Sequence, residues 1–145
     1  GANFLTMMDL VYKKIPMPFK GFRNKRSLVF VGNISDLIYT CILNNNIKNC
    51  CLLISDNELI SSNELMRLIS QNFGKKLKLF KVPLFLLLII FYLLNKKSQF
   101  DRIKSSLVVD ASHTKHILKW SPPYTLEEGL KITTDAYKKN KLLKY

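Results

Sequence analysis

The sequence predicts an α/β fold in which short strands alternate with helices. Short apolar runs that suit strands recur between segments whose apolar residues have helical spacing. Two Ser/Thr-x-x-Glu capping boxes mark helix starts, and isolated glycines and prolines separate the segments. The strands are too few and too short for a complete doubly wound sheet. We therefore expect residues 1–145 to form a single lobe that is part of a larger protein structure.

The first part of the chain is expected to begin with a helix over Asn3–Lys14 (NFLTMMDLVYKK), which ends before a Pro-x-Pro sequence. A basic loop follows, and Ser27–Val31 (SLVFV) is apolar and β-branched enough to predict a strand. Asn33 or Ser35 is then expected to cap a helix over Asp36–Leu43.

The middle of the chain continues this alternation. Asn44–Asn49 is polar and predicts a loop, whereas Cys50–Ile54 (CCLLI) predicts a buried strand. Ser61 and Glu64 form a capping box, which predicts a helix that ends at Gly74.

The remaining elements follow from the same signals. They are a strand over Lys76–Val82, an apolar helix from Pro83, a short strand over Leu107–Val109, a helix to Leu118 capped by Asp110 or Ser112, and a last helix opened by the capping box of Thr125 and Glu128.

The apolar run Val82–Leu94 (VPLFLLLIIFYLL) raises the question of a membrane. It is about two-thirds as long as the ~20 apolar residues that span a bilayer. Its length favours a buried or interfacial helix over a membrane span. Contact with a membrane surface stays open as a second interpretation.

The chain has a formal net charge of +13, which has two explanations. An anionic partner such as nucleic acid, a membrane surface or a phosphorylated ligand would account for it. A coding bias toward lysine would also do so, and we favour this explanation because the lysines are scattered along the chain. A nucleic-acid-binding surface would concentrate them on one face, so no nucleic-acid partner is expected.

The cysteines predict neither a disulfide framework nor a zinc site. Cys41, Cys50 and Cys51 are few and badly spaced, and the sequence contains no Cys-x-x-Cys pair. Cys50 and Cys51 are expected on a half-buried strand as small apolar residues. Together with the lack of a signal-peptide pattern at the N-terminus, this predicts a cytoplasmic protein.

No complete catalytic or metal-binding motif is present in the sequence. The glycines stand apart, with no G-x-G-x-x-G or G-x-x-x-x-G-K pattern. Two Tyr-x-x-x-Lys matches, starting at Tyr92 and Tyr137, follow no dinucleotide-binding unit and are interpreted as accidental. His113 and His116 share a helix face but lack a third metal ligand. We therefore assign no catalytic residue and no metal site.

Four ordered sequence blocks resemble the NAD-dependent epimerase/dehydratase family, the extended short-chain dehydrogenases that act on nucleotide sugars. The blocks are Asn24–Asp36 (NKRSLVFVGNISD), Ile54–Asp56 with Ser61–Leu65, Ser106–Asp110 (SLVVD), and Leu118–Pro123 (LKWSPP) followed by Leu126–Leu130 (LEEGL). They resemble the UDP-glucose and UDP-N-acetylglucosamine 4-epimerases of surface-polysaccharide pathways, and they cover essentially the whole chain.

The resemblance implies the C-terminal, substrate-binding lobe of such an enzyme without its Rossmann half. A complete member would have the glycine-rich loop, a catalytic Ser or Thr and a catalytic Tyr-Lys pair before Gly1. The family implies NAD as cofactor, but its binding site is not expected in this chain. We therefore expect a fragment of a nucleotide-sugar 4-epimerase or dehydratase that is inactive alone, with a separate Rossmann half as a candidate partner.

Four residues match positions that bind substrate in the family. The resemblance implies that Arg26 clamps the diphosphate of a UDP-sugar, and that Arg102 supplies a second arginine, which suits phosphate because a guanidinium is a fork of donors. It places Asn3 near the sugar-phosphate end and Phe19 beside the base. Their alternatives are a surface charge for each arginine, a helix cap for Asn3 and core packing for Phe19.

A second hypothesis gives the chain a different function. A small basic protein could use the apolar helix 83–94 to bind a membrane surface or another protein. The four family blocks favour the first hypothesis, since a generic membrane protein has no reason to carry them in this order.

Overall fold

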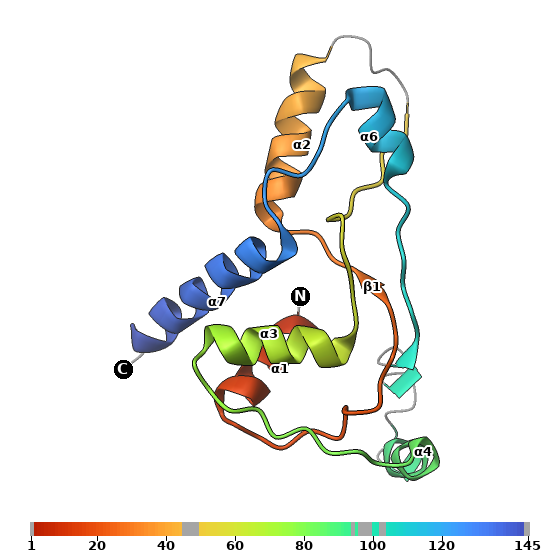
Figure 1. Cartoon of the computed structure of the whole chain (residues 1–145), viewed down its shortest axis with the longest axis vertical. Helices are drawn as coiled ribbons and strands as arrows, with labels where there is room; N and C mark the ends of the chain where they lie inside the picture. The colour runs from red at the N-terminus through yellow and green to blue at the C-terminus, as the bar shows by residue number, and fades with distance from the viewer. Residues whose placement is uncertain (1, 45–49, 94, 96–99, 102–103, 144–145) are drawn as a thin grey trace. The chain divides into compact units, whose positions relative to one another are not determined.

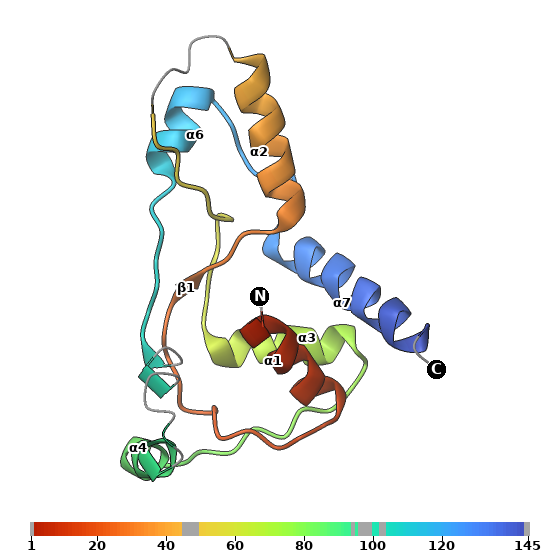
Figure 2. The same ribbon diagram turned by 180° about the vertical axis from the view of Figure 1, so that it is seen from behind.

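The computed structural model describes residues 2–44, 50–93, 95, 100–101 and 104–143 (Figures 1 and 2). Two short strands, β1 (Arg26–Ser27) and β2 (Leu59–Ile60), pair in a two-stranded sheet. The helices are α1 (Ala2–Tyr12), α2 (Val31–Leu43), α3 (Ser62–Asn72), α4 (Leu84–Leu93), α6 (Ser112–Leu118) and α7 (Leu126–Leu142). This mixed architecture of helices and short strands confirms the predicted α/β class.

The chain divides into two compact units, each made of two separate segments. Unit 1 consists of Gly1–Arg26 and Ile60–Leu107, and unit 2 of Ser27–Leu59 and Val108–Tyr145. Unit 1 contains α1, α3 and α4, and unit 2 contains α2, α6 and α7.

In unit 1, α1 and α3 lie side by side (Figures 1 and 2). Met8 and Val11 of α1 are buried, as are Leu65, Met66 and Ile69 of α3. The Tyr12 and Phe73 rings make an edge-to-face contact at 5.3 Å. α3 ends at the predicted Gly74, whose φ of +63° suits a residue without a side chain. α1 ends before its prolines as predicted, but at Tyr12 rather than Lys14.

A smaller apolar cluster of unit 1 anchors α4. Leu87 of α4 packs with Phe22 and Phe100, and Phe19 and Phe91 cover the cluster's edge. Among the residues that the structure describes, no helix is long and apolar enough to cross a membrane.

In unit 2, α2 and α6 pack through one apolar cluster. Leu37 of α2 meets Leu118 of α6 and the ring of Trp120, with Leu52 and Ile54 packed against them. The Trp120 indole also donates a 2.6 Å hydrogen bond from Nε1 to the Asp36 carboxylate. The predicted helix to Leu118 is confirmed, but its predicted cap is wrong, because Ala111 occupies the capping position with no side-chain hydrogen bond. The Asp110 carboxylate, one residue earlier, accepts a 2.9 Å hydrogen bond from the Ser112 N–H.

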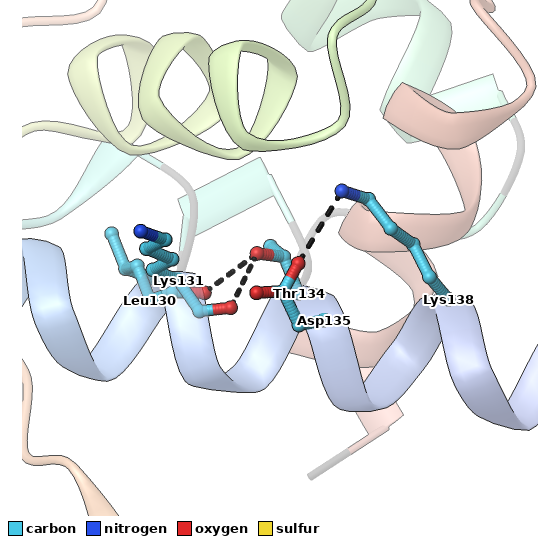
Figure 3. A network of polar contacts seen from close by, with 5 residues as sticks. All are labelled: Leu130, Lys131, Thr134, Asp135 and Lys138. Atoms are coloured by element: carbon cyan, nitrogen blue, oxygen red, sulfur yellow. Dashed lines mark hydrogen bonds and ion pairs between the residues drawn. The ribbon is translucent and has the colours of Figure 1, made fainter.

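α7 begins at the predicted capping box of Thr125 and Glu128. Its buried positions, Leu126, Gly129, Leu130, Thr134 and Tyr137, follow the helical period. Figure 3 shows how the buried Thr134 hydroxyl is satisfied, since its Oγ1 lies 2.9 Å from the carbonyl oxygens of both Leu130 and Lys131. On the same helix Lys138 and Asp135 form an ion pair at 3.4 Å.

The structure corrects the extent of the predicted strands. Ser27–Val31 contributes only Ser27 to β1, and Cys50–Ile54 forms no strand, with Cys50 and Cys51 exposed rather than half-buried. Lys76–Val82 reduces to one bridge between Leu79 and Met17, and Leu107–Val109 to one bridge between Leu107 and Arg26. A strand needs a partner along its length, which an apolar run by itself does not supply.

The predicted start and cap of α2 are also wrong. The helix begins at Val31 rather than Asp36, and Phe30 occupies the capping position with no side-chain hydrogen bond. Asn33 is fully buried inside the helix, and Ser35 donates its hydroxyl back to the Val31 carbonyl at 3.1 Å. Tertiary contacts of Asn33, rather than capping, decide where this helix begins.

Candidate functional site

Arg26 lies on β1, where the backbone is held from two directions. β2 pairs with β1, and Leu107 forms a parallel bridge with Arg26. Beside it, the Lys25 carbonyl accepts a 2.9 Å hydrogen bond from the Leu107 N–H, and the Lys25 N–H donates to the Ser106 hydroxyl at 2.9 Å. The Arg26 side chain is half-buried, and the bridge and hydrogen bonds around it hold its backbone in place.

Asn24 joins the loop before Arg26 to two other segments of unit 1. Its buried Nδ2 donates to the Ser62 hydroxyl at 3.0 Å and to the Ser105 carbonyl at 3.5 Å, and its Oδ1 accepts from the Ser62 N–H at 3.1 Å. The start of α3 and the segment before Leu107 therefore meet beside β1. Sequence reasoning assigned no role to Asn24, although it is the first residue of the Asn24–Asp36 block.

Phe19 packs in the cluster around Leu87. Its ring meets Phe22 edge-to-face at 5.3 Å and is half-buried. The residue after it, Lys20, lines two open hollows of unit 1, and Leu79 also lines both. One, of about 270 Å³, is lined by Lys20, Arg67, Ser70, Gln71, Leu77 and Leu79. The other, of about 710 Å³, is lined by Lys20, Gly21, Arg23, Leu79, Phe80 and Lys81.

The structure says less about the other two residues that were predicted to bind substrate. Asn3 is the second residue of α1, and Arg102 lies outside the described residues. Within the described part of the chain, neither Arg26 nor Phe19 lines either hollow. The structure thus places Arg26 and Phe19 in the same unit without gathering them around one of these hollows.

Asn33 and Asp56 form a buried polar pair in unit 2 that sequence reasoning missed. Asn33 Nδ2 donates to Asp56 Oδ1 at 2.6 Å and to the Tyr124 carbonyl at 3.0 Å, and its Oδ1 accepts from the Tyr124 N–H at 3.0 Å. Asp56 Oδ2 accepts from the Phe30 N–H at 3.0 Å. The one feature of the sequence that could have pointed to this pair is that Asn33 and Asp56 both lie within the blocks that resemble the family. Because the pair is fully bonded internally, its role is to hold segments together.

The shifted pKa values in the structure have local causes. The pKa of Glu64 is lowered by the Ser61 backbone N–H and hydroxyl that donate to it, and the pKa of Glu128 is lowered by the corresponding groups of Thr125. Burial lowers the pKa of Lys75, as does the nearby charge of Lys14. Lys75 also donates to the Tyr12 carbonyl at 2.6 Å. Within the described residues, no three His, Cys, Asp or Glu side chains are grouped as metal ligands would be.

Gly32 shows whether one strand–helix junction could take a dinucleotide. A pyrophosphate-binding turn needs a glycine after a strand with open space for the phosphates to approach the backbone. Gly32 follows β1 and stands in the first turn of α2, but a Cβ there would meet the Phe30 ring at 2.6 Å and the Tyr124 ring at 3.0 Å. The space is filled by aromatic side chains, so this strand–helix junction does not fit NAD.

Comparisons with known proteins relate the chain to enzymes of nucleotide sugars. It is 41% identical to the UDP-glucose 4-epimerase of Vibrio cholerae over 137 residues, which are 94% of this chain and 42% of that protein. No protein-family model matches the chain.

Two solved structures contain a part with the fold of this chain. The UDP-glucose 4-epimerase of Thermotoga maritima, solved with UDP-glucose, matches with a TM-score of 0.64 at 19% identity. The dTDP-glucose 4,6-dehydratase of Bacillus anthracis, solved with NAD, matches with a TM-score of 0.63 at 20% identity. Each match covers 93% of this chain and 38% of the other, so the chain spans less than half the length of these relatives. The resemblance indicated by the sequence blocks is confirmed.

Proposed function

We propose that this chain, which is related in sequence and fold to part of the NAD-dependent epimerase/dehydratase family, binds the nucleotide-sugar substrate of such an enzyme. The observation that carries the proposal is the 41% identity to a UDP-glucose 4-epimerase across 94% of the chain. A structural relative solved with UDP-glucose makes a UDP-sugar the first ligand to test. The proposal assigns the chain to substrate binding rather than to catalysis.

Arg26 is the residue proposed to hold the diphosphate of the UDP-sugar. Its backbone is braced by β2 and by Leu107, and a guanidinium offers two parallel donors to phosphate oxygens. Fixing the backbone in advance lowers the entropy lost when the side chain binds. Arg102 is proposed as a second diphosphate contact and Asn3 as a donor near the sugar.

Phe19 is proposed to lie beside the base of the nucleotide. Its ring is already fixed by Phe22, and the exposed Lys20 and Arg23 follow it in the chain. These cations give the surface a positive potential that favours an anionic ligand. The open hollow lined by Lys20, Gly21 and Arg23 leaves room there for a ligand to enter.

NAD supplies hydride transfer when it is bound in enzymes of this family. The filled space at Gly32 supports the proposal that NAD is held by residues outside this chain. What the present residues do is bind and orient the sugar nucleotide. We therefore propose that the chain by itself does not complete an active site.

A chimera tests this function directly. The matched portion of the Vibrio cholerae epimerase, 42% of its length, is replaced by this chain, and conversion of UDP-glucose to its 4-epimer is measured with NAD present. We expect the chimera to turn over UDP-glucose well above the background of the relative with its matched portion deleted. A folded chimera that binds NAD but neither binds nor converts any UDP-sugar would contradict the proposal.

The same experiment addresses the alternative function suggested by the sequence. A membrane-surface or interaction protein built around the apolar helix 83–94 has no reason to provide a nucleotide-sugar site. Such a protein would not restore activity to the epimerase of another organism.

A further inference from the structure

α4 exposes apolar side chains over most of its circumference. Seven of its ten residues are large hydrophobics with 42% to 77% of their surface exposed: Leu84, Phe85, Leu86, Leu88, Ile89, Tyr92 and Leu93. With 3.6 residues per turn, these seven side chains occupy a continuous arc of roughly 200°. Leu87 and Phe91 lie on the opposite side and attach the helix to Phe22 and Phe100.

The width of this face favours a lipid environment over a protein groove. A helix that packs on protein uses an apolar stripe of about 100°, and a helix that is apolar nearly all round is found in a protein core or in lipid. At 1.5 Å per residue, α4 is about 15 Å long, which is half the ~30 Å hydrocarbon thickness. It is therefore suited to lie within one leaflet. Tyr92, with its polar phenol, suits the boundary between acyl chains and headgroups.

The net charge of the chain is concentrated in the unit that carries α4. Unit 1 contains 15 of the 23 lysines and arginines but only three of the ten acidic residues, so it carries +12 of the formal +13. Unit 2, with eight basic and seven acidic residues, is almost neutral. The lysines are shared between the units, 11 in unit 1 and eight in unit 2. The difference in charge comes mainly from the four arginines, all in unit 1, and from the acidic residues, most of which are in unit 2.

Basic residues also lie directly beside α4 in the sequence. No Asp or Glu occurs between Glu64 and Asp101. Lys76, Lys78 and Lys81 are exposed in the extended segment that leads into the helix. An apolar helix next to exposed cations is the combination that binds a bilayer containing anionic lipid.

We infer that α4 and the exposed lysines Lys76, Lys78 and Lys81 form a membrane-docking surface for anionic phospholipid, with α4 lying in the interface of one leaflet. A nucleic acid would neutralise the lysines but leave seven apolar side chains in water. A second copy of the chain would bring two units of charge +12 together, which opposes association. This surface is additional to the proposed nucleotide-sugar site and does not depend on it.

Vesicle co-sedimentation of the full chain, without nucleotide, tests the inference. Phosphatidylcholine vesicles are compared with vesicles that also contain phosphatidylglycerol, at 0.1 M and 1 M salt. We expect binding to the anionic vesicles to be at least about tenfold tighter, and to weaken at high salt, because the Debye length falls from about 10 Å to about 3 Å. Absence of binding to anionic vesicles at 0.1 M salt overturns the inference.

Paired variants locate the surface. Phe85→Ser with Leu88→Ser should weaken binding by about tenfold or more, since both exposed side chains lose their contact with lipid. Lys78→Glu with Lys81→Glu should weaken binding to anionic vesicles by a similar factor and leave binding to neutral vesicles unchanged, since each lysine near the surface contributes about fivefold.

Matched control variants in unit 2 distinguish binding through this surface from non-specific binding of the chain to vesicles. Leu142 and Leu143 are 75% and 83% exposed, so Leu142→Ser with Leu143→Ser removes comparable apolar surface, and Lys131→Glu with Lys139→Glu removes comparable charge. These variants should bind within about twofold of the parent. Equal losses in the unit 2 variants, or self-association through α4 in place of vesicle binding, would contradict the inference.

The depth to which α4 inserts into the bilayer is measured with the Tyr92→Trp variant and vesicles of brominated lipid. The introduced indole should be quenched on anionic vesicles, while Trp120, 93% buried in unit 2, serves as an internal reference that is not quenched. Quenching of neither indole in the bound state would show that α4 is not in the lipid.

Discussion

At the scale of single residues, Asn33 and Asp56 have the clearest structural role. Asn33 connects α2 to Tyr124, while Asp56 accepts from Phe30 and donates its own N–H to the Leu28 carbonyl at 2.8 Å. Three stretches of unit 2 that are far apart in sequence thus share one buried network. Such a network is stabilising only while every member is paired.

Asn33→Ala is expected to destabilise unit 2 by at least about 2 kcal/mol. The substitution leaves the buried Asp56 Oδ1 without its partner, which costs about 1–3 kcal/mol, and also removes the partner of the part-buried Tyr124 N–H and carbonyl. Urea unfolding followed by the fluorescence of Trp120, the only tryptophan, measures it. The exposed Asn140 provides the control, since Asn140→Ala should change stability by no more than about 0.5 kcal/mol. Equal stabilities for the two variants would remove the structural role of Asn33.

Arg26 is the residue on which the proposed substrate site depends most. In the chimera, Arg26→Ala should weaken UDP-glucose binding by about 30-fold or more, because losing one partner of a desolvated charged hydrogen bond costs about 2–5 kcal/mol. Arg26→Lys should recover only part of the affinity, since an ammonium keeps the charge but lacks the planar fork.

Calorimetric titration of UDP-glucose into the chimeras measures these affinities. Lys25→Ala is the matched control, because Lys25 is exposed and its hydrogen bonds come from its backbone. Its affinity should stay within about 0.5 kcal/mol of the parent, and NAD affinity should be unchanged in all three variants. If Arg26→Ala binds as tightly as Lys25→Ala, Arg26 does not hold the diphosphate.

At the scale of elements, the helices start and stop through local interactions. α3 begins where Ser61 and Glu64 exchange hydrogen bonds, with Glu64 accepting from the Ser61 N–H at 2.9 Å and donating its own N–H to Ser61 Oγ at 3.1 Å. α7 begins in the same way at Thr125 and Glu128. These contacts span three residues and need no partner elsewhere in the chain.

The capping box of α3 predicts a pH dependence. The donors of Ser61 hold the pKa of Glu64 below its ordinary value of 4.5, so the ionised carboxylate stabilises the folded state. This contribution is fully present above pH 4.5 and is lost as the pH falls through the lowered folded-state pKa.

The difference in stability between the parent and Glu64→Gln measures this effect. It should be about 0.5 kcal/mol at pH 7 and should shrink toward zero at acidic pH, since glutamine keeps the hydrogen bond but not the charge. Urea unfolding at pH 7 and at pH 3, with the exposed Glu58→Gln as reference, gives the comparison. A difference that is the same at both pH values would rule out the carboxylate charge as the cause.

Gly129 allows α7 to approach Phe30 closely. A Cβ at this position would lie 2.8 Å from both Cβ and Cγ of Phe30, near the base of that side chain where it cannot swing away. Gly129→Ala should therefore destabilise the protein by about 1–2 kcal/mol, although alanine is the better helix former by about 1 kcal/mol. Thermal unfolding against Gly21→Ala, a turn position where the added Cβ would lie 3.8 Å from its nearest neighbour, separates the close contact from a general effect of replacing glycine. Stabilisation by Gly129→Ala would refute the close contact.

At the scale of the whole molecule, the chain alone is expected not to convert UDP-glucose. The glycine-rich loop of the family has no counterpart in the sequence, and the two Tyr-x-x-x-Lys matches follow no dinucleotide-binding unit. A Cβ at Gly32 would meet aromatic rings. Purified chain with UDP-glucose and NAD should show no turnover in an assay in which the chimera is active. Turnover by the chain alone at a rate comparable to the chimera would disprove the assignment to substrate binding only.

The sequence by itself was sufficient to predict the resemblance to nucleotide-sugar epimerases, the α/β class and most helix boundaries. The start of α3 and α7, the end of α3 at Gly74 and the end of α1 before its prolines depend on residues within a few positions of each other. Arg26 was identified from its motif alone, and its role stays a prediction. The residues that determine these features lie close together in the sequence, so the features can be predicted from the sequence alone.

Only the tertiary structure decided the strands, the start of α2 and the distribution of charge. Whether SLVFV or CCLLI forms a strand depends on a partner backbone distant in sequence, and neither run has one along its length. Asn33 was interpreted as a cap because its partners, Asp56 and Tyr124, lie 23 and 91 residues away. The net charge is concentrated in unit 1, which joins two separate segments of the chain that hold all four arginines and only three of the ten acidic residues. Each of these outcomes depends on which distant residues meet, and the free energy of those contacts overrides local preference.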